Sequence, residues 1–356
     1  MVKLDEQLLN KNKESEIFSA YVAPDALASS VERNRNLAKE LAREIYEYDP
    51  EELVLVGSGA SNCTLYTAYY YMKARSNLDV RLAFGPTLEL EDDALLKDRM
   101  ARGRVYAILA SYSGSTADTV SASRFLKEHG VPRLAITRDR SNKLADSCDR
   151  VLAYEDKCLY TSAMGNTLSV LAELLELRGE SEAARDLRDA LHALPEQMRA
   201  ALEPSDQAAQ QGFQDVLDHD MFYVLGDGAL WGLVYQYGYT NLMEYTRVHA
   251  GCVRSCEWRH GPLEILHRAP AVVNFLGSDR TRDYALITKK YCEENGATVV
   301  TFDSEDYFST LPELTPFAVH AVSQLFLLYL TTYRGIDMDD YLEMHVKPYM
   351  SGETYF

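Results

Sequence analysis

Residues 105–120 read VYAILASYSGSTADTV, and this stretch decides the fold class. The apolar, β-branched run at its start predicts a buried strand. A turn rich in hydroxyl groups follows, with Ser111, Ser113, Ser115 and Thr116, and then residues with helical spacing. A strand that leads through such a turn into a helix predicts an anion site, because the free N–H groups and the positive dipole end of the helix point at the turn.

The anion that suits this turn is a phosphate monoester, such as a sugar phosphate. The turn has no lysine and there is no G-x-x-x-x-G-K-[ST] motif, so a magnesium-bound nucleotide triphosphate is not indicated. An alternative is that serine and threonine stand here only as good turn and N-cap residues. Both interpretations stay open on this stretch alone.

The composition is that of an ordinary soluble globular protein: 356 residues, 47% hydrophobic and 25% charged. The formal net charge of −18 argues against nucleic acid or an anionic membrane as a partner. No apolar run approaches the ~18 residues that span a bilayer, and the polar N-terminus lacks the apolar core of a signal peptide. Six cysteines in a chain this long do not form a dense disulfide framework, so we expect a reducing, cytoplasmic location.

A metal site has to be considered at Cys252 and Cys256, which are four positions apart and have His249 nearby. The remaining cysteines show no C-x-x-C spacing, and free cysteine is a common small core residue. We therefore expect no metal here.

A pattern of strand, glycine turn and helix occurs twice in the chain. The segments LVLVGSGAS and FYVLGDGAL align, with Gly57 over Gly226 and Gly59 over Gly228. Further strand-like runs follow each copy: VRLAFG and VYAILAS after the first, AVVNFL and ATVVTFD after the second. Strands that alternate with helices predict parallel sheets with right-handed crossovers. We therefore expect an α/β fold of two lobes, each a doubly wound parallel sheet flanked by helices.

The boundary between the lobes is expected near residue 204. The segment between the two copies is helical in pattern with no strand signal, and Pro204 marks the expected break. The helix expected at 316–335 is apolar enough to be buried. The expected parts are an N-terminal helix, first lobe and helical connector at 1–203, a second lobe at 204–340 and a tail at 341–356.

Both glycine turns invite comparison with dinucleotide-binding folds. The G-x-G-x-x-G motif requires glycine at positions that hold Asn62 and Trp231, so NAD or FAD is not expected. In open α/β sheets the ligand still lies at the carboxyl ends of the strands. This rule gathers the hydroxyl residues of the first lobe around one crevice: Ser58, Ser61, Ser111, Ser113 and Thr116.

Two residues are candidates for proton transfer. Glu244 is the one carboxylate in WGLVYQYGYTNLMEYTRVHAG, which predicts a helix, and His260 follows sixteen positions later in CEWRHGPLEIL. A carboxylate in an apolar wall has a raised pKa and a histidine titrates near neutrality, so the two could move protons at pH 7. The alternatives are that Glu244 lies on the solvated face of an amphipathic helix and that His260 fills a turn.

The stretches ILASYSGSTADTV and EWRHGPLEI together resemble the sugar isomerase (SIS) family. The layout of residues 30–356 is similar to the isomerase part of glucosamine-6-phosphate synthases and to the stand-alone fructoselysine-6-phosphate deglycases. The resemblance implies that Glu244 is the catalytic glutamate and His260 the ring-opening histidine. It also implies the phosphate-binding residues, namely Ser61, Ser111, Ser113, Thr116, and Thr161 or Ser162 in LYTSAMGN.

The resemblance also implies how the site is completed. In SIS dimers the histidine commonly reaches the site from the partner subunit, so we expect a homodimer or a higher oligomer. The synthases use a tail lysine as a Schiff base, and Lys347 is the only tail lysine here. Tyr112 replaces the glutamine of the synthase turn. A deglycase substrate already carries an amine, so Lys347 would bind substrate without forming a Schiff base.

The function that follows is deglycation of a 6-phosphorylated sugar that carries an amine or amino acid moiety, with hexose 6-phosphate and free amine as products. No metal or organic cofactor is expected. Two alternatives stay open. One is an aldose–ketose or amino-sugar-phosphate isomerase or deaminase that uses the same residues. The other is a non-catalytic sugar-phosphate sensor.

Overall fold

The structure, a computed structural model, describes residues 2–90 and 93–343. It divides into two compact units, which are described separately. The N-terminal unit is Ala23–Pro195, and the C-terminal unit is Glu196–Leu342 together with the segment before Ala23. Lys347 lies outside the described residues.

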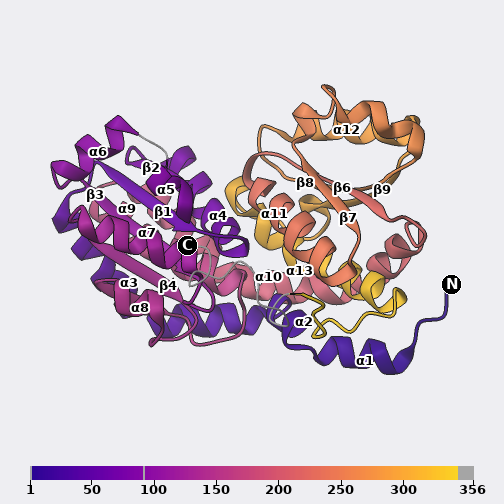
Figure 1. Ribbon diagram of the computed structural model, residues 1–356, viewed down its shortest axis with the longest axis horizontal. Coiled ribbons are helices and arrows are strands. Elements are labelled where there is room, and N and C mark those ends of the chain that lie inside the picture. The colour runs from indigo at the N-terminus through magenta and orange to yellow at the C-terminus, as the bar shows by residue number, and fades with distance from the viewer. Residues whose placement is uncertain (1, 91–92, 344–356) are drawn as a thin grey trace. The chain divides into compact units, whose positions relative to one another are not determined.

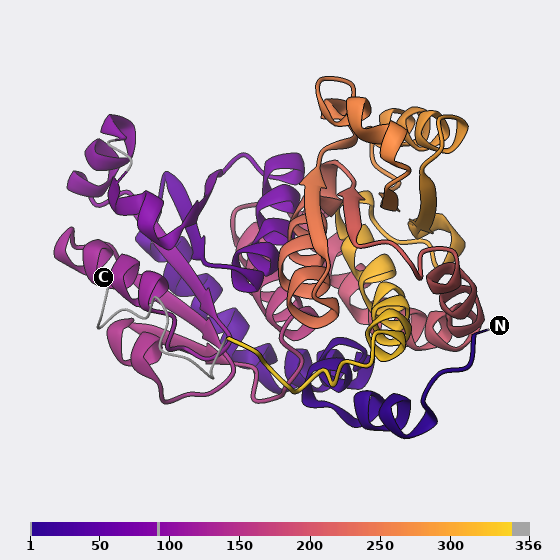
Figure 2. The same cartoon turned by 45° about the vertical axis from the view of Figure 1, so that its right-hand side comes forward.

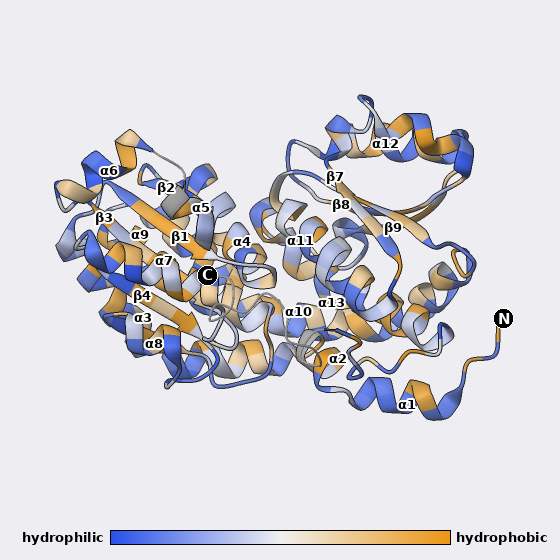
Figure 3. Cartoon of the chain, in the orientation of Figure 1, coloured by the Kyte–Doolittle hydropathy of each residue, from blue (hydrophilic) through white to orange (hydrophobic). Residues whose placement is uncertain are grey.

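The N-terminal unit is built on a five-stranded parallel sheet (Figure 1). The strand order is β2 (Asp79–Phe84), β1 (Glu52–Gly57), β3 (Val105–Ser111), β4 (Arg133–Thr137) and β5 (Arg150–Ala153). Every residue of β1, β3 and β4 is buried, and Figure 3 shows β1 in the colour of apolar residues. Burial on both faces explains why these strands are nearly continuous apolar runs in the sequence.

Helices cover both faces of this sheet (Figures 1 and 2). One core joins the sheet to α5 (Gly85–Leu90), α6 (Ala94–Ala101), α7 (Ala117–Glu128) and α8 (Lys143–Ser147). The other helices are α3 (Pro24–Tyr48), α4 (Ala60–Arg75) and α9 (Thr161–Leu177). Helices α3 and α9 pack closely, because Gly165 leaves room for Leu27: a Cβ on this glycine would lie 2.3 Å from Leu27 Cδ1.

The C-terminal unit has a four-stranded parallel sheet. Its order is β7 (His249–Val253), β6 (Met221–Leu225), β8 (Ala271–Leu276) and β9 (Thr298–Asp303). One face packs on α12 (Arg282–Glu294) and the short 3₁₀ helices η3 (Ser255–Glu257) and η4 (Pro262–Arg268). Aromatic contacts from Phe275 to Tyr237 and Phe302, and from Phe302 to Phe326 of α13 (Thr315–Tyr333), build the core on the other face.

The two parallel sheets with their helices confirm the predicted fold class of two doubly wound lobes. The first copy of the repeat forms β1 and α4, and the second forms β6 and the helical segment after it. The apolar helix expected at 316–335 is α13, and it is buried along nearly its whole length.

Four features differ from the sequence-based expectations. The first is the segment that begins at Trp231, which was predicted to be one helix. It forms α11 (Trp231–Tyr235), then an eleven-residue π-helix, η2 (Gln236–Thr246), and it ends in strand β7. The change occurs at Arg247, whose left-handed backbone (φ 55°) stops the helix. The pairing of β7 with β6 then fixes the following residues as a strand.

The second difference concerns Pro204. Helix α10 (Ser181–Gln214) continues through this residue, where a break was expected. Ala201, Ser205, Ala209 and Phe213 form a buried stripe at helical spacing, whereas Pro204 lies on the exposed face. Burial of the stripe therefore holds the helix together, and the missing N–H of proline costs least on the side that faces water.

The third difference concerns the length of the most apolar segment in the chain. By length and composition the segment Pro312–Tyr333 is apolar enough to cross a membrane, so the expectation that no apolar run approaches this length is wrong. The most apolar 18 residues of this segment are entirely buried inside the protein, as expected of a core helix.

The N-terminal segment packs within the C-terminal unit, although it was expected to accompany the first lobe. Asn12 of α1 (Glu6–Glu14) is fully buried, and its side-chain amide donates to Thr332 Oγ1 at 3.1 Å and to the carbonyl of Ile336 at 3.0 Å. The amide oxygen of Asn12 accepts from the N–H of Met338 at 2.9 Å. A buried amide satisfied on both sides fixes this segment against the end of α13.

Candidate functional site

The hydroxyl turn lies between β3 and α7, at the carboxyl edge of the N-terminal sheet. Ser111 Oγ and Thr116 Oγ1 are 3.1 Å apart, and Ser111 Oγ accepts from the N–H of Gly114 at 3.1 Å. Gly114 has φ 62°, and a Cβ there would lie 2.0 Å from the Asn142 side chain. Only glycine meets both demands, so this residue fixes the shape of the turn.

Thr116 is the N-cap of α7, but its hydroxyl is bonded to Ser111 and makes no cap to the helix amides. The first N–H groups of α7 are thus left to another acceptor. Ser111 is buried, Ser113 is exposed and Thr116 is half-buried, so the turn presents hydroxyls from its interior outward. This arrangement suits an anion that approaches from the surface.

The first glycine turn lies beside the hydroxyl turn. Ser61, in the first turn of α4, accepts from the N–H of Tyr112 at 3.4 Å and so joins the two turns. Ser58 Oγ is buried and has no hydrogen-bond partner among the residues that the structure describes. Ser61, Ser111, Ser113 and Thr116 are therefore gathered at one edge of the sheet, as the sequence predicted for a phosphate site, and their role in binding stays a prediction.

Thr161 and Ser162 are placed differently. Both lie fully buried in the first turn of α9. Thr161 Oγ1 lies 2.9 Å from Cys158 Sγ, and Ser162 Oγ donates to Asp156 Oδ2 at 3.0 Å. Burial raises the pKa of Asp156. These hydroxyls are bonded to inner partners rather than to the two turns.

Arg138 is a neighbour of the turn that sequence reasoning missed. It directly follows β4, and its guanidinium lies 5.0 Å from the centre of the Tyr112 ring and 3.3 Å from the Tyr112 hydroxyl. The backbone N–H of Arg138 donates to the Tyr112 carbonyl at 3.3 Å. The available signal was its place after the strand next to β3, because neighbouring parallel strands end at one edge.

Glu244 lies in the π-helix η2 of the C-terminal unit. It is half-buried, and burial raises its pKa from 4.5 to about 7, against a smaller lowering effect of a hydrogen bond with Tyr245. π-Helical turns are rare, and they frequently occur at functional sites. The alternative of a fully solvated Glu244 is wrong. A carboxyl group with this pKa is partly protonated at neutral pH and can both donate and accept a proton.

His260 lies in a turn between η3 and η4, as Gly261 and Pro262 predicted. Its backbone N–H donates to the Glu257 carbonyl at 3.1 Å, while Trp258, two residues earlier, is buried and anchors the turn. The His260 side chain is exposed. The same unit thus holds Glu244 on a helix and His260 in a turn, with the His260 side chain exposed.

The cysteines near His249 have ordinary partners. Cys252 Sγ lies 3.3 Å from the Val234 carbonyl, and Cys256 Sγ lies 3.4 Å from Asp227 Oδ1. Within the described part of the chain, no three histidine, cysteine or acidic side chains come close enough to hold a metal ion.

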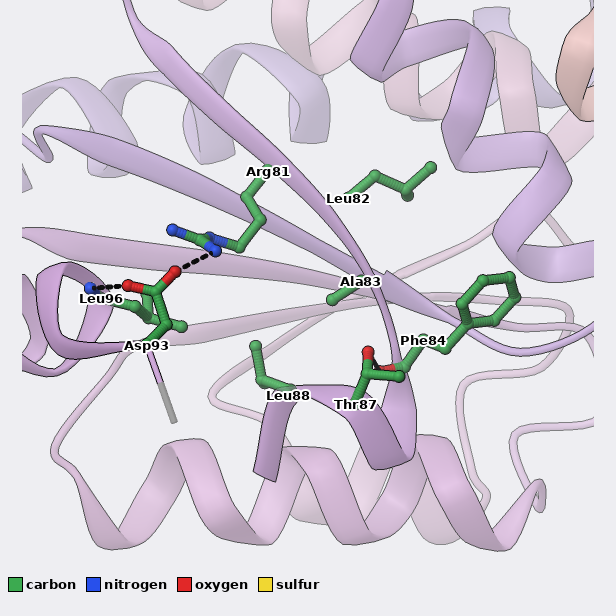
Figure 4. A pocket seen from close by; sticks show the side chains of 8 residues that line it. All are labelled: Arg81, Leu82, Ala83, Phe84, Thr87, Leu88, Asp93 and Leu96. Carbon is green, nitrogen blue, oxygen red and sulfur yellow. Dashed lines mark hydrogen bonds and ion pairs between the residues drawn. The ribbon is translucent and has the colours of Figure 1, made fainter. Parts of the chain in front are cut away.

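A separate pocket of about 160 Å³ lies beside β2 and contains none of the predicted residues (Figure 4). Arg81 donates across it to Asp93 at 2.6 Å and also to Glu52 at 2.8 Å. The polar groups of this pocket therefore already bond one another. Its lining residues are Arg81, Leu82, Ala83, Phe84, Thr87, Leu88, Asp93 and Leu96.

Comparison with known proteins gives relatives along most of the chain, although no family model matches it. The chain is 22% identical over 305 residues to fructoselysine 6-phosphate deglycase of Escherichia coli, covering 85% of this chain and 88% of that protein. It is 24% identical over 264 residues to a fructosamine deglycase of Bacillus subtilis, covering 72% and 78%. It is 25% identical over 347 residues to a glutamine–fructose-6-phosphate aminotransferase of Thermococcus kodakarensis, and it spans 55% of that longer protein.

Solved structures share the fold over nearly the whole chain. A Bacillus subtilis protein provisionally described as a phosphosugar isomerase has a TM-score of 0.81 at 20% identity, covering 90% of this chain and 100% of that one. The C-terminal domain of a glucosamine-fructose-6-phosphate aminotransferase from Francisella tularensis has a TM-score of 0.75 at 18% identity, covering 92% and 98%.

Proposed function

We propose that this chain, a member of the sugar isomerase (SIS) domain family by its motifs, its relatives and its fold, is a deglycase of a 6-phosphorylated sugar–amine adduct. Broadly, the relatives support a sugar-phosphate isomerase or deglycase. The finer assignment is to an adduct of the fructoselysine 6-phosphate or glucoselysine 6-phosphate type. Water is consumed, and hexose 6-phosphate and the amine are released.

The observation that carries the proposal is the pKa of Glu244, which burial raises to about 7. Conversion of a ketoamine to an imine requires removal of a proton from C1 and delivery of a proton to C2, and a single carboxyl group can do both. An ordinary carboxylate, with a pKa near 4.5, is a weak base at neutral pH, whereas a carboxylate with a pKa near 7 is a stronger base that still releases the proton it has taken up. A non-catalytic sensor has no need of such a group.

The other candidate residues would have separate roles in phosphate binding, ring opening and substrate contact. The turn with Ser111, Ser113 and Thr116 would hold the phosphate, and this remote binding energy would orient the reacting carbons. His260 would exchange a proton with the ring oxygen to open the sugar. Glu244 would then move the proton between C1 and C2 through an enolamine, and water would hydrolyse the resulting imine. Because the substrate brings its own amine, Lys347 would contact substrate without forming a bond to it.

Assembly and location are part of the proposal. The exposed position of His260 supports a site completed by a partner chain, so we propose a homodimer or a higher oligomer. The relatives and the acidic charge support a cytoplasmic enzyme without nucleic-acid or membrane partners.

The test is a substrate comparison. The protein is incubated with fructoselysine 6-phosphate, glucoselysine 6-phosphate and glucosamine 6-phosphate, and hexose phosphate and amine are measured together. Equal amounts of both products from a lysine adduct support the deglycase. Turnover of glucosamine 6-phosphate alone would make the chain an amino-sugar-phosphate deaminase. Tight binding with no turnover of any of them would make it a sensor.

A further inference from the structure

The two units carry the same turn arrangement at the carboxyl ends of their sheets, and strand register defines the matching positions. Val56 of β1 pairs with Leu109 of β3, and Leu225 of β6 pairs with Asn274 of β8. Because Gly57 matches Gly226 in the repeat, Val56 matches Leu225, and so Leu109 matches Asn274. Counting forward from that pair aligns YSGST at residues 112–116 with GSDRT at residues 277–281.

Two positions in this match matter for anion binding. Thr116 corresponds to Thr281, and each threonine is the N-cap of the following helix, α7 in one unit and α12 in the other. Gly114 corresponds to Asp279. The N-terminal unit therefore has no side chain at a position where the C-terminal unit has a carboxylate.

The second glycine of each glycine turn shows what that carboxylate does. Gly59 and Gly228 have nearly the same φ angle, 55° and 54°. Beside Gly59 the space is open: a Cβ there would meet no described atom within 4 Å. Beside Gly228 a Cβ would lie 2.0 Å from Asp279 Oδ2. The Asp279 carboxylate fills the room that the N-terminal unit leaves open.

The donors around Asp279 are those of an anion site. Its Oδ2 accepts from the N–H of Ala229 at 2.9 Å, and its Oδ1 accepts from the N–H of Thr281 at 2.8 Å and from the Thr281 hydroxyl. The bond to Ala229 crosses 50 positions of the chain, so it is more than a local turn at the start of α12. The counterparts of these donors in the N-terminal unit are Ala60 and Thr116.

Two neighbouring positions also differ between the units. Asp227 stands where the N-terminal unit has Ser58, and it is 6% exposed. Leu230 stands in place of Ser61. The C-terminal unit thus has a carboxyl group and an apolar side chain where the N-terminal unit has two hydroxyl groups.

We propose that the backbone turns around Gly228 and Thr281 form a second anion-binding site, the C-terminal cradle, and that the Asp279 carboxylate occupies it. Each chain then binds a single phosphate monoester, in the corresponding open site beside Gly59 and Ala60, the N-terminal cradle. The C-terminal cradle keeps the backbone of a phosphate site and is closed by its own carboxylate. This goes beyond the proposed reaction, because it concerns the number and location of phosphate sites whichever sugar phosphate is the substrate.

The experiment measures inorganic phosphate bound per chain by equilibrium dialysis on the full-length protein. The wild type should bind one. Gly59→Ala, which places a methyl group in the open space, should bind none. Its matched control is Gly130→Ala, where φ is 69° and no described atom lies within 4 Å, and this variant should still bind one. The double variant Asp227→Ser with Asp279→Gly recreates the Ser-Gly-x-Thr turn and should bind two.

The outcomes separate this proposal from the proposed function. A wild type that binds two, or a folded double variant that gains no phosphate, overturns the closed cradle. A wild type that binds none, with a double variant that binds one, supports the closed cradle and removes the N-terminal phosphate site instead. If the double variant does not fold, Gly228→Ala decides: it should leave the single phosphate in place, and its loss would place that phosphate in the C-terminal unit.

Discussion

Glu244→Gln should change how the stability of the protein depends on pH. Burial raises the pKa of Glu244 from 4.5 to about 7. The folded chain therefore binds more protons than the unfolded chain between these values, and the stability contributed by this group is lost as pH rises through the window. The difference between the two pKa values corresponds to roughly 3 kcal/mol in the free energy of unfolding. Glutamine does not titrate, so the variant should not show this loss.

The assay is urea unfolding of wild type and Glu244→Gln at pH 4.5 and pH 8. Between these pH values the wild type should lose about 3 kcal/mol more than the variant. Glu264→Gln, an exposed carboxyl on η4, is the matched control and should follow the wild type. If the wild type and Glu244→Gln changed in parallel, Glu244 would have an ordinary pKa and the argument for its role would fail.

Four further outcomes are expected. His260→Asn should lower kcat about 10²–10⁴-fold, whereas His267→Asn, an exposed histidine on η4, should leave it unchanged; equal losses would refute a specific role. Mixing the inactive Glu244→Gln and His260→Asn chains should restore part of the activity if partner subunits share a site, and no recovery in mixed oligomers would contradict sharing. Gly114→Ala should destabilise the protein by about 1–3 kcal/mol in thermal unfolding, since it adds strain at φ 62° and a clash with a side chain; an unchanged Tm would be the contrary result. Arg138→Met should raise KM severalfold with kcat retained, and an unchanged KM would remove Arg138 from the site.

The parts of the fold that the sequence revealed are those with long local patterns. β1, β3 and β8 are continuous apolar runs, because both of their faces are buried. Strand β5 has only four residues, too few to show a period, and was not foreseen. The sequence predicts the end of a helix where strand β7 lies, because HAGCV has no strand pattern of its own and is held in place by pairing with β6. The π-helix η2 could not be predicted, since it depends on packing rather than on residue spacing.

In the candidate site, too, the residues of one local motif could be predicted, whereas those brought together by the fold could not. Ser111, Ser113 and Thr116 were visible because one turn carries all three. Arg138 comes from a neighbouring strand, and the inner hydrogen bond of Ser162 depends on Asp156, so neither could be seen in a single motif. The raised pKa of Glu244 was anticipated from its apolar surroundings, and its cause, burial, is a property of the folded unit.

The role of Glu244 is tested by the rate of hexose 6-phosphate release from fructoselysine 6-phosphate at pH 7, measured for wild type, Glu244→Gln and Glu264→Gln. The wild type and Glu264→Gln should release hexose phosphate and lysine in equal amounts, while Glu244→Gln should bind the substrate and be slower by about 10²–10⁴-fold. Near-native turnover by Glu244→Gln would contradict the proton transfer that we assign to this residue.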